Sequence, residues 1–585
     1  MMSKKLKIKI VEIALVIVCI LILAKVRIWL TSDIRYDFDS FKIQTADTGF
    51  FINNALDFDT YNIFTEFALI KNRAHIWFLK LASMSGYSLN TCVAFMWVLS
   101  AILVYLMLKE FKVNRWASIG IYAYTLFCPL AFFNHSFLYR HIIYIQLLLI
   151  CFSSFILYDM SLINKRPKLY SIFFGILAGV SMVFTFFIDE VGMAYILSVI
   201  GLTILINIYY LVKDFIENGQ DKLTKNKIVI HRFKKHIKYF AIMLLPLLIF
   251  VMSYYAYKYI NFRVYGKYVV NQRTDGEIGR FLSLVQTIDS ADTSTYIWSS
   301  MEQLEKANAV SETFDNEMMS VFSDFKKIYG NEKGIHGDFL GWACVWQLEN
   351  KYPLFKQIND EIEKAFDLGL LQKTKKIRLT RTSGAYTLDE IRGEVLPLAK
   401  ETVKYLFTFD EFEPWAVVWT KTNIDTEGRF TKFFNLDKVA DDGTNNDDKR
   451  MALINVYKKA NKILLAAFLL NAFITIYLVA LMIIKKDVYH IVKNNFKFLA
   501  FEFFAVAIMV LFLGYVFCMS WFNIWLKVSD YQIINTPAFL SFFYSGRAYA
   551  FLIMSFAFTV GASMTFLSEI YRKHIHGRLR RAMRK

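Results

Sequence analysis

Three polar stretches of the chain carry residue types suited to acid–base chemistry and anion binding. The first contains Asp47 and Lys71, the second Arg140, and the third the neighbouring acids Asp189 and Glu190. A positioned carboxylate can act as a general base, and a guanidinium fork suits the oxygens of a phosphate. Charges beside long apolar runs are costly unless they are paired or hydrated, so these stretches are the first candidates for a functional site.

Each stretch also has a plainer interpretation. Arg140 can be an anchor that extends from a helix end to the lipid head groups, and Asp189–Glu190 can be a solvated turn. If the three stretches lie on one face, they supply a base for an acceptor hydroxyl, cations for a departing phosphate and an apolar groove for a lipid tail. A divalent cation held by Asp189 or Glu190 would be Mg²⁺ or Mn²⁺ rather than Zn²⁺, although the spacing itself requires no metal.

The elements that must position these residues are transmembrane helices. The 585 residues are 56% hydrophobic, 17% aromatic and only 20% charged, which excludes disorder and an ordinary soluble enzyme. With about 20 residues for one crossing, the apolar runs predict ten spans. They lie near residues 10–31, 88–108, 116–133, 141–160, 170–188, 191–212, 239–260, 461–484, 497–519 and 548–568.

The distribution of Lys and Arg predicts the orientation of these spans. Basic residues concentrate before the first run, in the segment 213–238 and in the tail after Arg572, so we expect both termini in the cytoplasm. The first run exceeds the length of a signal peptide and is expected to be an uncleaved anchor. The net charge of +18 comes with no nucleic-acid motif, so the basic clusters are interpreted as topology determinants that attract anionic lipids.

The predicted fold is a mainly α polytopic membrane protein in three parts. Residues 1–262 form an N-terminal membrane domain with seven helices and a first outer loop, 32–87. Residues 263–457 form an extracytoplasmic, mainly helical domain with apolar periodicity over 300–329, 351–371 and 388–406. Residues 458–585 form three further helices and a basic cytoplasmic tail. The acidic tract 441–448 is expected to be a solvated loop that returns to the membrane.

This arrangement resembles the GT-C class of polytopic glycosyltransferases, and the resemblance starts at Asp47 in the first outer loop. More closely, the chain is similar to a little-characterised bacterial membrane family of that class. The motifs that carry the similarity are Asp47-Thr48, Lys71 to Phe78, Pro129, Tyr139-Arg140, Tyr144, Asp189-Glu190, Asn261 to Gly266, Ile358 to Ile362 and Asp367 to Gly369. The likeness spans most of the chain, although each motif is short.

The resemblance implies an inverting transfer of a sugar from a polyprenyl-phosphate donor to an envelope glycan or a lipid-linked acceptor, in the bacterial cytoplasmic membrane. It implies that Asp47 is the general base and that Arg140, Lys71 and, more weakly, Arg35 hold the lipid phosphate. Asp189 and Glu190 then orient the acceptor or bind a cation.

The chain departs from this family at two positions. The family often has paired acids where this chain has Asp47-Thr48, which leaves one candidate base. It usually has an arginine where this chain has Ile188, which moves phosphate binding toward Arg140 and Lys71.

Two other classes of function stay open. A transporter or flippase of lipid-linked saccharides would also need basic groups near the membrane surface, although such proteins tend to show internal repeats and helices broken by Gly or Pro. A non-catalytic envelope assembly protein would use residues 263–457 to bind a partner. The sequence predicts neither the donor sugar nor the acceptor.

Overall fold

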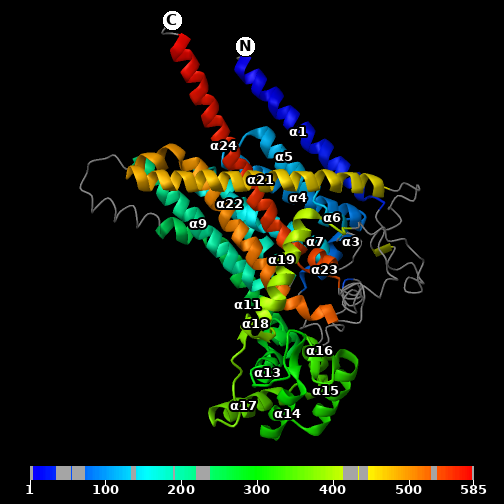
Figure 1. Ribbon diagram of the computed structural model, residues 1–585. Helices are drawn as coiled ribbons and strands as arrows, with labels where there is room; N and C mark the ends of the chain where they lie inside the picture. The colour runs from blue at the N-terminus through cyan, green and yellow to red at the C-terminus, as the bar shows by residue number, and fades with distance from the viewer. Residues whose placement is uncertain are drawn as a thin grey trace.

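A computed structural model describes residues 4–33, 55, 73–133, 140–188, 192–218, 237–412, 432–433, 446–528 and 536–582. The described part of the chain is mainly helical, and eight of its helices are long and apolar enough to cross a membrane (Figure 1). These eight are α1 (Lys4–Thr31), α4 (Leu89–Glu110), α7 (His141–Ile163), α8 (Lys168–Phe186), α9 (Gly192–Asn218), α21 (Asp447–Lys485), α22 (Val488–Asn523) and α24 (Tyr549–Ala582). The protein is therefore a mainly α polytopic membrane protein.

A ninth crossing is formed if two consecutive helices count as one. Residues 237–243 and α11 (Leu245–Tyr265) meet at a bend of 42°. Pro246 stands in the first turn of α11, where its missing N–H leaves no intrahelical bond unmade.

The expected span at 116–133 is wrong for the described residues. Helix α5 (Arg115–Leu126) has 12 residues, fewer than one crossing requires, and a separate turn, α6 (Leu130–Phe133), follows it. Pro129 lies between the two. It has no N–H to donate, and its ring disfavours the helical conformation of the preceding residue, so the helix ends before it. The apolar run is continuous in sequence, but the helix is not.

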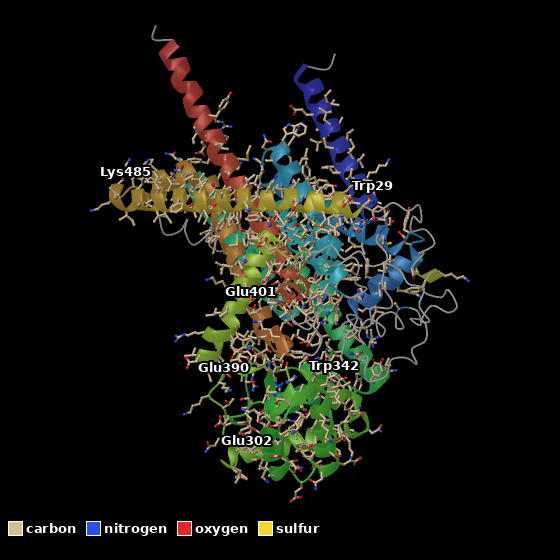
Figure 2. The ribbon with its side chains drawn as sticks, turned by 45° about the vertical axis from the view of Figure 1, so that its right-hand side comes forward. Trp29, Glu302, Trp342, Glu390, Glu401 and Lys485 are labelled. Carbon is tan, nitrogen blue, oxygen red and sulfur yellow. The ribbon has the colours of Figure 1, made fainter. Side chains whose placement is uncertain are left out.

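Helix α7 is the centre of the membrane bundle. It is buried along its whole span, and it contacts α4, α8, α9 and α24. Helix α21 instead crosses the outside of the bundle at a large angle to α22 and α24 (Figure 1). Its 39 residues make it roughly 58 Å long. Figure 2 labels Lys485, its last residue, and Trp29 of α1, whose ring lies 4.5 Å from Lys449 Nζ near the other end.

Residues 272–371 form a helical unit at the end of the molecule opposite both termini (Figure 1). The expected helices at 300–329 and 351–371 are present, although the first is divided at Ser311–Asp315. The unit also contains a three-stranded antiparallel sheet in the order β1-β3-β2, which the periodicity did not predict. The elements are α12 (Gln272–Asp275), α13 (Glu277–Val285), β1 (Ile297–Ser300), α14 (Met301–Val310), α15 (Asn316–Tyr329), β2 (Gly330–Asn331), β3 (Gly334–His336), α16 (Phe339–Trp346), η4 (Glu349–Lys351) and α17 (Leu354–Asp367).

The unit has its own apolar core, whereas the segment that follows it packs against the membrane helices. Buried side chains from Ile278 to Leu371 form a core separate from that of the bundle. The hairpin β4 (Ile377–Arg378) and β5 (Ala385–Tyr386) leads into α18 (Leu388–Glu390), η5 (Ile391–Val395) and α19 (Leu396–Thr408), as the periodicity over 388–406 predicted. The buried residues of α19 belong to the core of the bundle.

A set of aromatic contacts joins the unit to the membrane domain. The Tyr386 hydroxyl accepts a hydrogen bond from Trp298 Nε1 at 2.8 Å and donates one to the Trp521 carbonyl at 3.1 Å. Trp521 Nε1 in turn donates to the Gly384 carbonyl at 3.0 Å. These buried bonds join the unit to the end of α22. The short helices η8 (Ile524–Val528), α23 (Pro537–Phe539), η9 (Leu540–Tyr544) and η10 (Gly546–Ala548) follow α22 in the chain.

Candidate functional site

Of the residues predicted to form the site, the structure describes Arg140. Asp47, Lys71, Arg35, Asp189 and Glu190 lie outside the described residues, so their roles stay predictions. What the structure does describe is the set of helix ends that flank the three predicted stretches.

Arg140 lies at the beginning of α7, and its position favours one of its two interpretations. An anchor that extends to the lipid head groups would be exposed, but Arg140 is 8% exposed. Its guanidinium is therefore inside the protein, at the N-terminal end of the central helix. This placement suits an internal anion site better than a surface anchor.

Arg140 belongs to a cluster of buried basic residues, here called the basic cluster: Arg140, His141, His75 and Arg547. His141 lies within electrostatic range of the other three. It packs on Phe543 with ring centroids 4.3 Å apart. The Arg547 guanidinium stands over the Tyr144 ring at 5.0 Å, and its Nε donates to the Tyr544 carbonyl at 2.9 Å.

The elements that build the basic cluster come from distant parts of the sequence. His75 is on α3 (Ala74–Met84), His141 on α7 and Arg547 on η10. Helix α7 contacts η10 directly. Three chain segments therefore place two arginines and two histidines in one buried region.

The beginning of α3 also meets the end of α8. The Ala74 N–H donates to the Phe187 carbonyl at 2.8 Å. Ala74 lies three residues after Lys71, and Phe187 two residues before Asp189. The described ends of the first and third predicted stretches thus lie beside each other, and His75 links them to the basic cluster.

Tyrosines line the inner side of the basic cluster. The rings of Tyr144 and Tyr195 are 5.8 Å apart, and the Tyr195 hydroxyl donates a hydrogen bond to the Tyr515 hydroxyl. These rings connect α7, α9 and α22. They offer cation–π contact and phenolic hydroxyls to a ligand whose charged group reaches the arginines.

A buried basic cluster of this kind can bind an anion. Two guanidinium groups provide forked donors, and low-dielectric surroundings strengthen their attraction for a phosphate. Within the ranges that the structure describes, no group of three His, Cys, Asp or Glu side chains is placed to hold a metal ion. The predicted Mg²⁺ or Mn²⁺ depends on Asp189 and Glu190 and stays a prediction.

Several other motif residues have structural partners in the helical unit and around it. Asn359 Nδ2 donates to the Glu277 carbonyl at 2.9 Å, and Glu361 accepts from Ser311 Oγ at 2.5 Å. Asn261 Nδ2 donates to the Val269 carbonyl at 2.8 Å, while Gly266 ends α11 with φ of +70°. These positions shape turns and helix starts.

The acidic tract 441–448 is described only from Asn446 onward, and there it is not a solvated loop. Asn446 is buried, and its N–H donates to Asp33 Oδ2 at 2.9 Å. Asp447 begins α21, so the helix starts fourteen residues before the expected span at 461. Asp447 pairs with Arg450 at 2.6 Å, and Asp448 is exposed in the first turn of α21.

Sequence reasoning missed Arg547, His75 and His141 as members of the site. Arg547 lies directly before the last apolar run and His141 directly after Arg140, so both occupied the kind of place that marked Arg140. No sequence signal joins residues 75, 141 and 547, because their proximity depends on the packing of three helices.

Comparison with protein-family models, with curated proteins and with solved structures finds no match to this chain.

Proposed function

We propose that this protein is a membrane glycosyltransferase that moves a sugar from a polyprenyl-phosphate donor to an extracytoplasmic cell-envelope acceptor. The observation that carries the proposal is the basic cluster, in which Arg140 and Arg547 are buried at the N-terminal end of α7. A buried pair of guanidinium groups fits the phosphate of a donor whose lipid tail remains in the bilayer.

The proposed reaction is an in-line displacement. The acceptor hydroxyl oxygen attacks the anomeric carbon, the bond from that carbon to the phosphate oxygen breaks, and the configuration inverts. Asp47 takes the hydroxyl proton. Arg140, with Lys71 and Arg35, stabilises the negative charge that the departing phosphate gains. Asp189 and Glu190 orient the acceptor or hold a divalent cation.

The proposed orientation places the basic cluster on the extracytoplasmic side. Both termini lie at one end of the molecule and the helical unit at the other (Figure 1). The basic tail after Arg572 favours a cytoplasmic location for the first end. The helical unit, residues 272–371, then lies outside the cytoplasmic membrane, where it can bind a glycan.

The experiment is transfer of labelled sugar from polyprenyl-phosphate hexoses to envelope glycan by the purified, reconstituted protein. We expect Asp47→Asn to lower the rate by roughly 10²- to 10⁴-fold, as for a lost general base. Arg140→Gln should raise the KM for the donor more than Arg140→Lys does. Arg115→Gln, at an exposed ion pair at the other end of the bundle, is the matched control. Full transfer by a normally folded Asp47→Asn variant would remove Asp47 from the mechanism.

One observation favours the second candidate, a transporter or flippase of lipid-linked saccharides. Asp159 in α7 and Glu502 in α22 are buried inside predicted spans, and ionisable residues at such depth often mark ion or proton pathways. Movement of a labelled lipid-linked saccharide across a vesicle bilayer, with no new glycosidic bond, would support this candidate. Loss of that movement in Asp159→Asn or Glu502→Gln would assign the carboxylates to it.

A further inference from the structure

Arg27 is a fully buried arginine in an otherwise exposed helix. It lies one turn before the end of α1, at 0% exposure, while most of the apolar side chains of α1 face outward. Its guanidinium stands over the Phe132 ring at 4.7 Å and near the Trp97 ring at 5.9 Å. Helix α1 rests on α4 and α5 here, so the charged group points into the protein and away from lipid and water.

The Arg27 side chain meets no acceptor. Within the described part of the chain, its Nε, Nη1 and Nη2 atoms are buried without a hydrogen-bond partner. Trp97 Nε1 is buried in the same condition. The Arg27 guanidinium lies 5.9 Å from the centre of the Trp97 ring, so the unused donors of these two side chains lie near each other.

The neighbouring arginine shows how this fold satisfies a buried guanidinium that is purely structural. Arg450 bonds Asp33 at 2.7 Å, Asp447 at 2.6 Å and the Leu30 carbonyl at 2.8 Å. Arg27 has none of these, and Arg450 adds a like charge beside it. A guanidinium remains charged in proteins and has donors only, so burial without an acceptor is unfavourable unless a ligand brings one.

We propose that Arg27 and Trp97 form a binding site for the phosphate of an anionic lipid. Indole N–H groups only donate, and the guanidinium fork matches two phosphate oxygens. The exposed side chains Ile22, Val26 and Trp29 on the same helix offer apolar surface to the acyl or prenyl chain. This proposal does not depend on the proposed glycosyl transfer, because a structural lipid and a substrate lipid carry the same group.

The experiment measures binding to the full-length protein in neutral phosphatidylcholine nanodiscs. The probes are polyprenyl phosphate, phosphatidylglycerol and inorganic phosphate. We expect Arg27→Met to weaken lipid binding at least tenfold and Arg27→Lys to weaken it less. Trp97→Phe, which keeps a ring and removes one donor, should weaken it severalfold. Arg115→Met, at an exposed pair, should bind as the parent does.

Thermal unfolding separates binding from folding. If Arg27 serves a ligand, Arg27→Met without added lipid should unfold at a temperature no lower than the parent, because it removes an uncompensated buried charge, and the stabilisation by added lipid should disappear. Binding of polyprenyl phosphate alone would identify the donor class of lipid, and equal binding of phosphatidylglycerol a bulk lipid. Unchanged binding of all three probes to Arg27→Met would overturn the proposal. If Arg27→Met does not fold, unchanged binding of the lipids to both Trp97→Phe and Arg27→Lys would overturn it.

Discussion

Replacing Asp33 by Asn should destabilise the protein strongly, because Asp33 ties α1 to α21 through a buried ion pair. Arg450 Nη1 lies 2.7 Å from Asp33 Oδ1 and Nη2 lies 3.1 Å from Oδ2, and the two side chains are 6% and 7% exposed. The Asn446 N–H also donates to Asp33. An asparagine keeps the shape of the carboxylate, removes its charge and replaces one acceptor oxygen by an NH2 donor, which then faces a donor of Arg450 or Asn446.

The structure sets the size of the expected loss. Removal of one partner from a buried pair typically costs about 3–5 kcal/mol, because the other charge stays buried. Here Arg450 keeps Asp447 at 2.6 Å and the Leu30 carbonyl at 2.8 Å. We therefore expect the lower end, about 3 kcal/mol of unfolding free energy. The double variant Asp33→Leu/Arg450→Met should recover much of it, since it leaves no charge behind.

The assay is reversible unfolding by SDS in mixed micelles, with a control on the same helix. Glu12 of α1 pairs with Arg115 at 2.8 Å, but the two side chains are 52% and 28% exposed. Glu12→Gln should therefore cost less than about 1 kcal/mol. If Asp33→Asn loses no more stability than Glu12→Gln, burial does not decide the strength of these pairs and the reasoning is wrong.

The same pair predicts a pH dependence. Burial acts to raise the pKa of Asp33, but the hydrogen bonds from Arg450 and Asn446 outweigh it, so the pKa lies below its ordinary value. A lowered pKa in the folded state means that the stabilisation is complete above the unfolded-state pKa of about 3.9 and is lost as the pH falls through the folded-state pKa. The difference in thermal stability between the parent and Asp33→Asn should be constant near neutral pH and should shrink below about pH 4.

Three further predictions concern the helical unit. Gly337→Ala should weaken the docking of the unit on the membrane domain by about 1–3 kcal/mol, because φ is +48° and a Cβ would overlap the Trp525 ring. Tryptophan fluorescence measures this change. The control is Gly266→Ala, where φ is +70° and the space is open, so only the smaller effect of backbone strain is expected. Ser300→Ala removes the capping box of α14 and should lower the unfolding free energy by about 1 kcal/mol in denaturant titration. Burial raises the pKa of the Cys344 thiol, so its alkylation at pH 8 should be at least about tenfold slower before unfolding than after it.

The sequence was sufficient to predict most of the membrane helices, because hydropathy measures the property that the bilayer selects. It failed at residues 116–133, where Pro129 ends the helix inside a continuous apolar run. A hydropathy average counts only the apolar character of the side chains. It does not register that Pro129 lacks the backbone N–H on which an α-helix depends. The same distinction explains α21, which continues through polar residues before 461 because helical hydrogen bonds do not require apolar side chains.

The helical unit was predictable in its helices and not in its strands. The apolar spacing over 351–371 and 388–406 gave α17 and α19. Strands β2 and β3 have two and three residues, too few to show a period of two, and they form because β3 pairs with β1 from another part of the chain.

The sequence was sufficient to mark single residues of the candidate site, but not to group them. Arg140 stood out because it directly precedes an apolar run, and its burial strengthens the case for an anion site. The grouping of Arg140 with His75 and Arg547 was not predictable, because the segments that carry them are separated by other helices in the sequence. The local sequence indicates where the burial of a charge costs free energy. Only the packing of α3, α7 and η10 indicates which charged side chains could contact the same ligand.

Arg27 and Arg450 also show that tertiary packing, and not residue type, decides the role of a buried charge. Both arginines are buried near the junction of α1 and α21, and both would be marked in a sequence as charges in or beside an apolar helix. What distinguishes them is Asp33, which lies 417 residues from Arg450 in the sequence and at 2.7 Å in space. Because Asp33 and Asp447 already neutralise Arg450, the charge on Arg27 has no described carboxylate left to balance it. Two arginines are buried here, but the nearby acids neutralise only Arg450. We therefore expect an anion that is not part of the chain to bind beside Arg27 on α1.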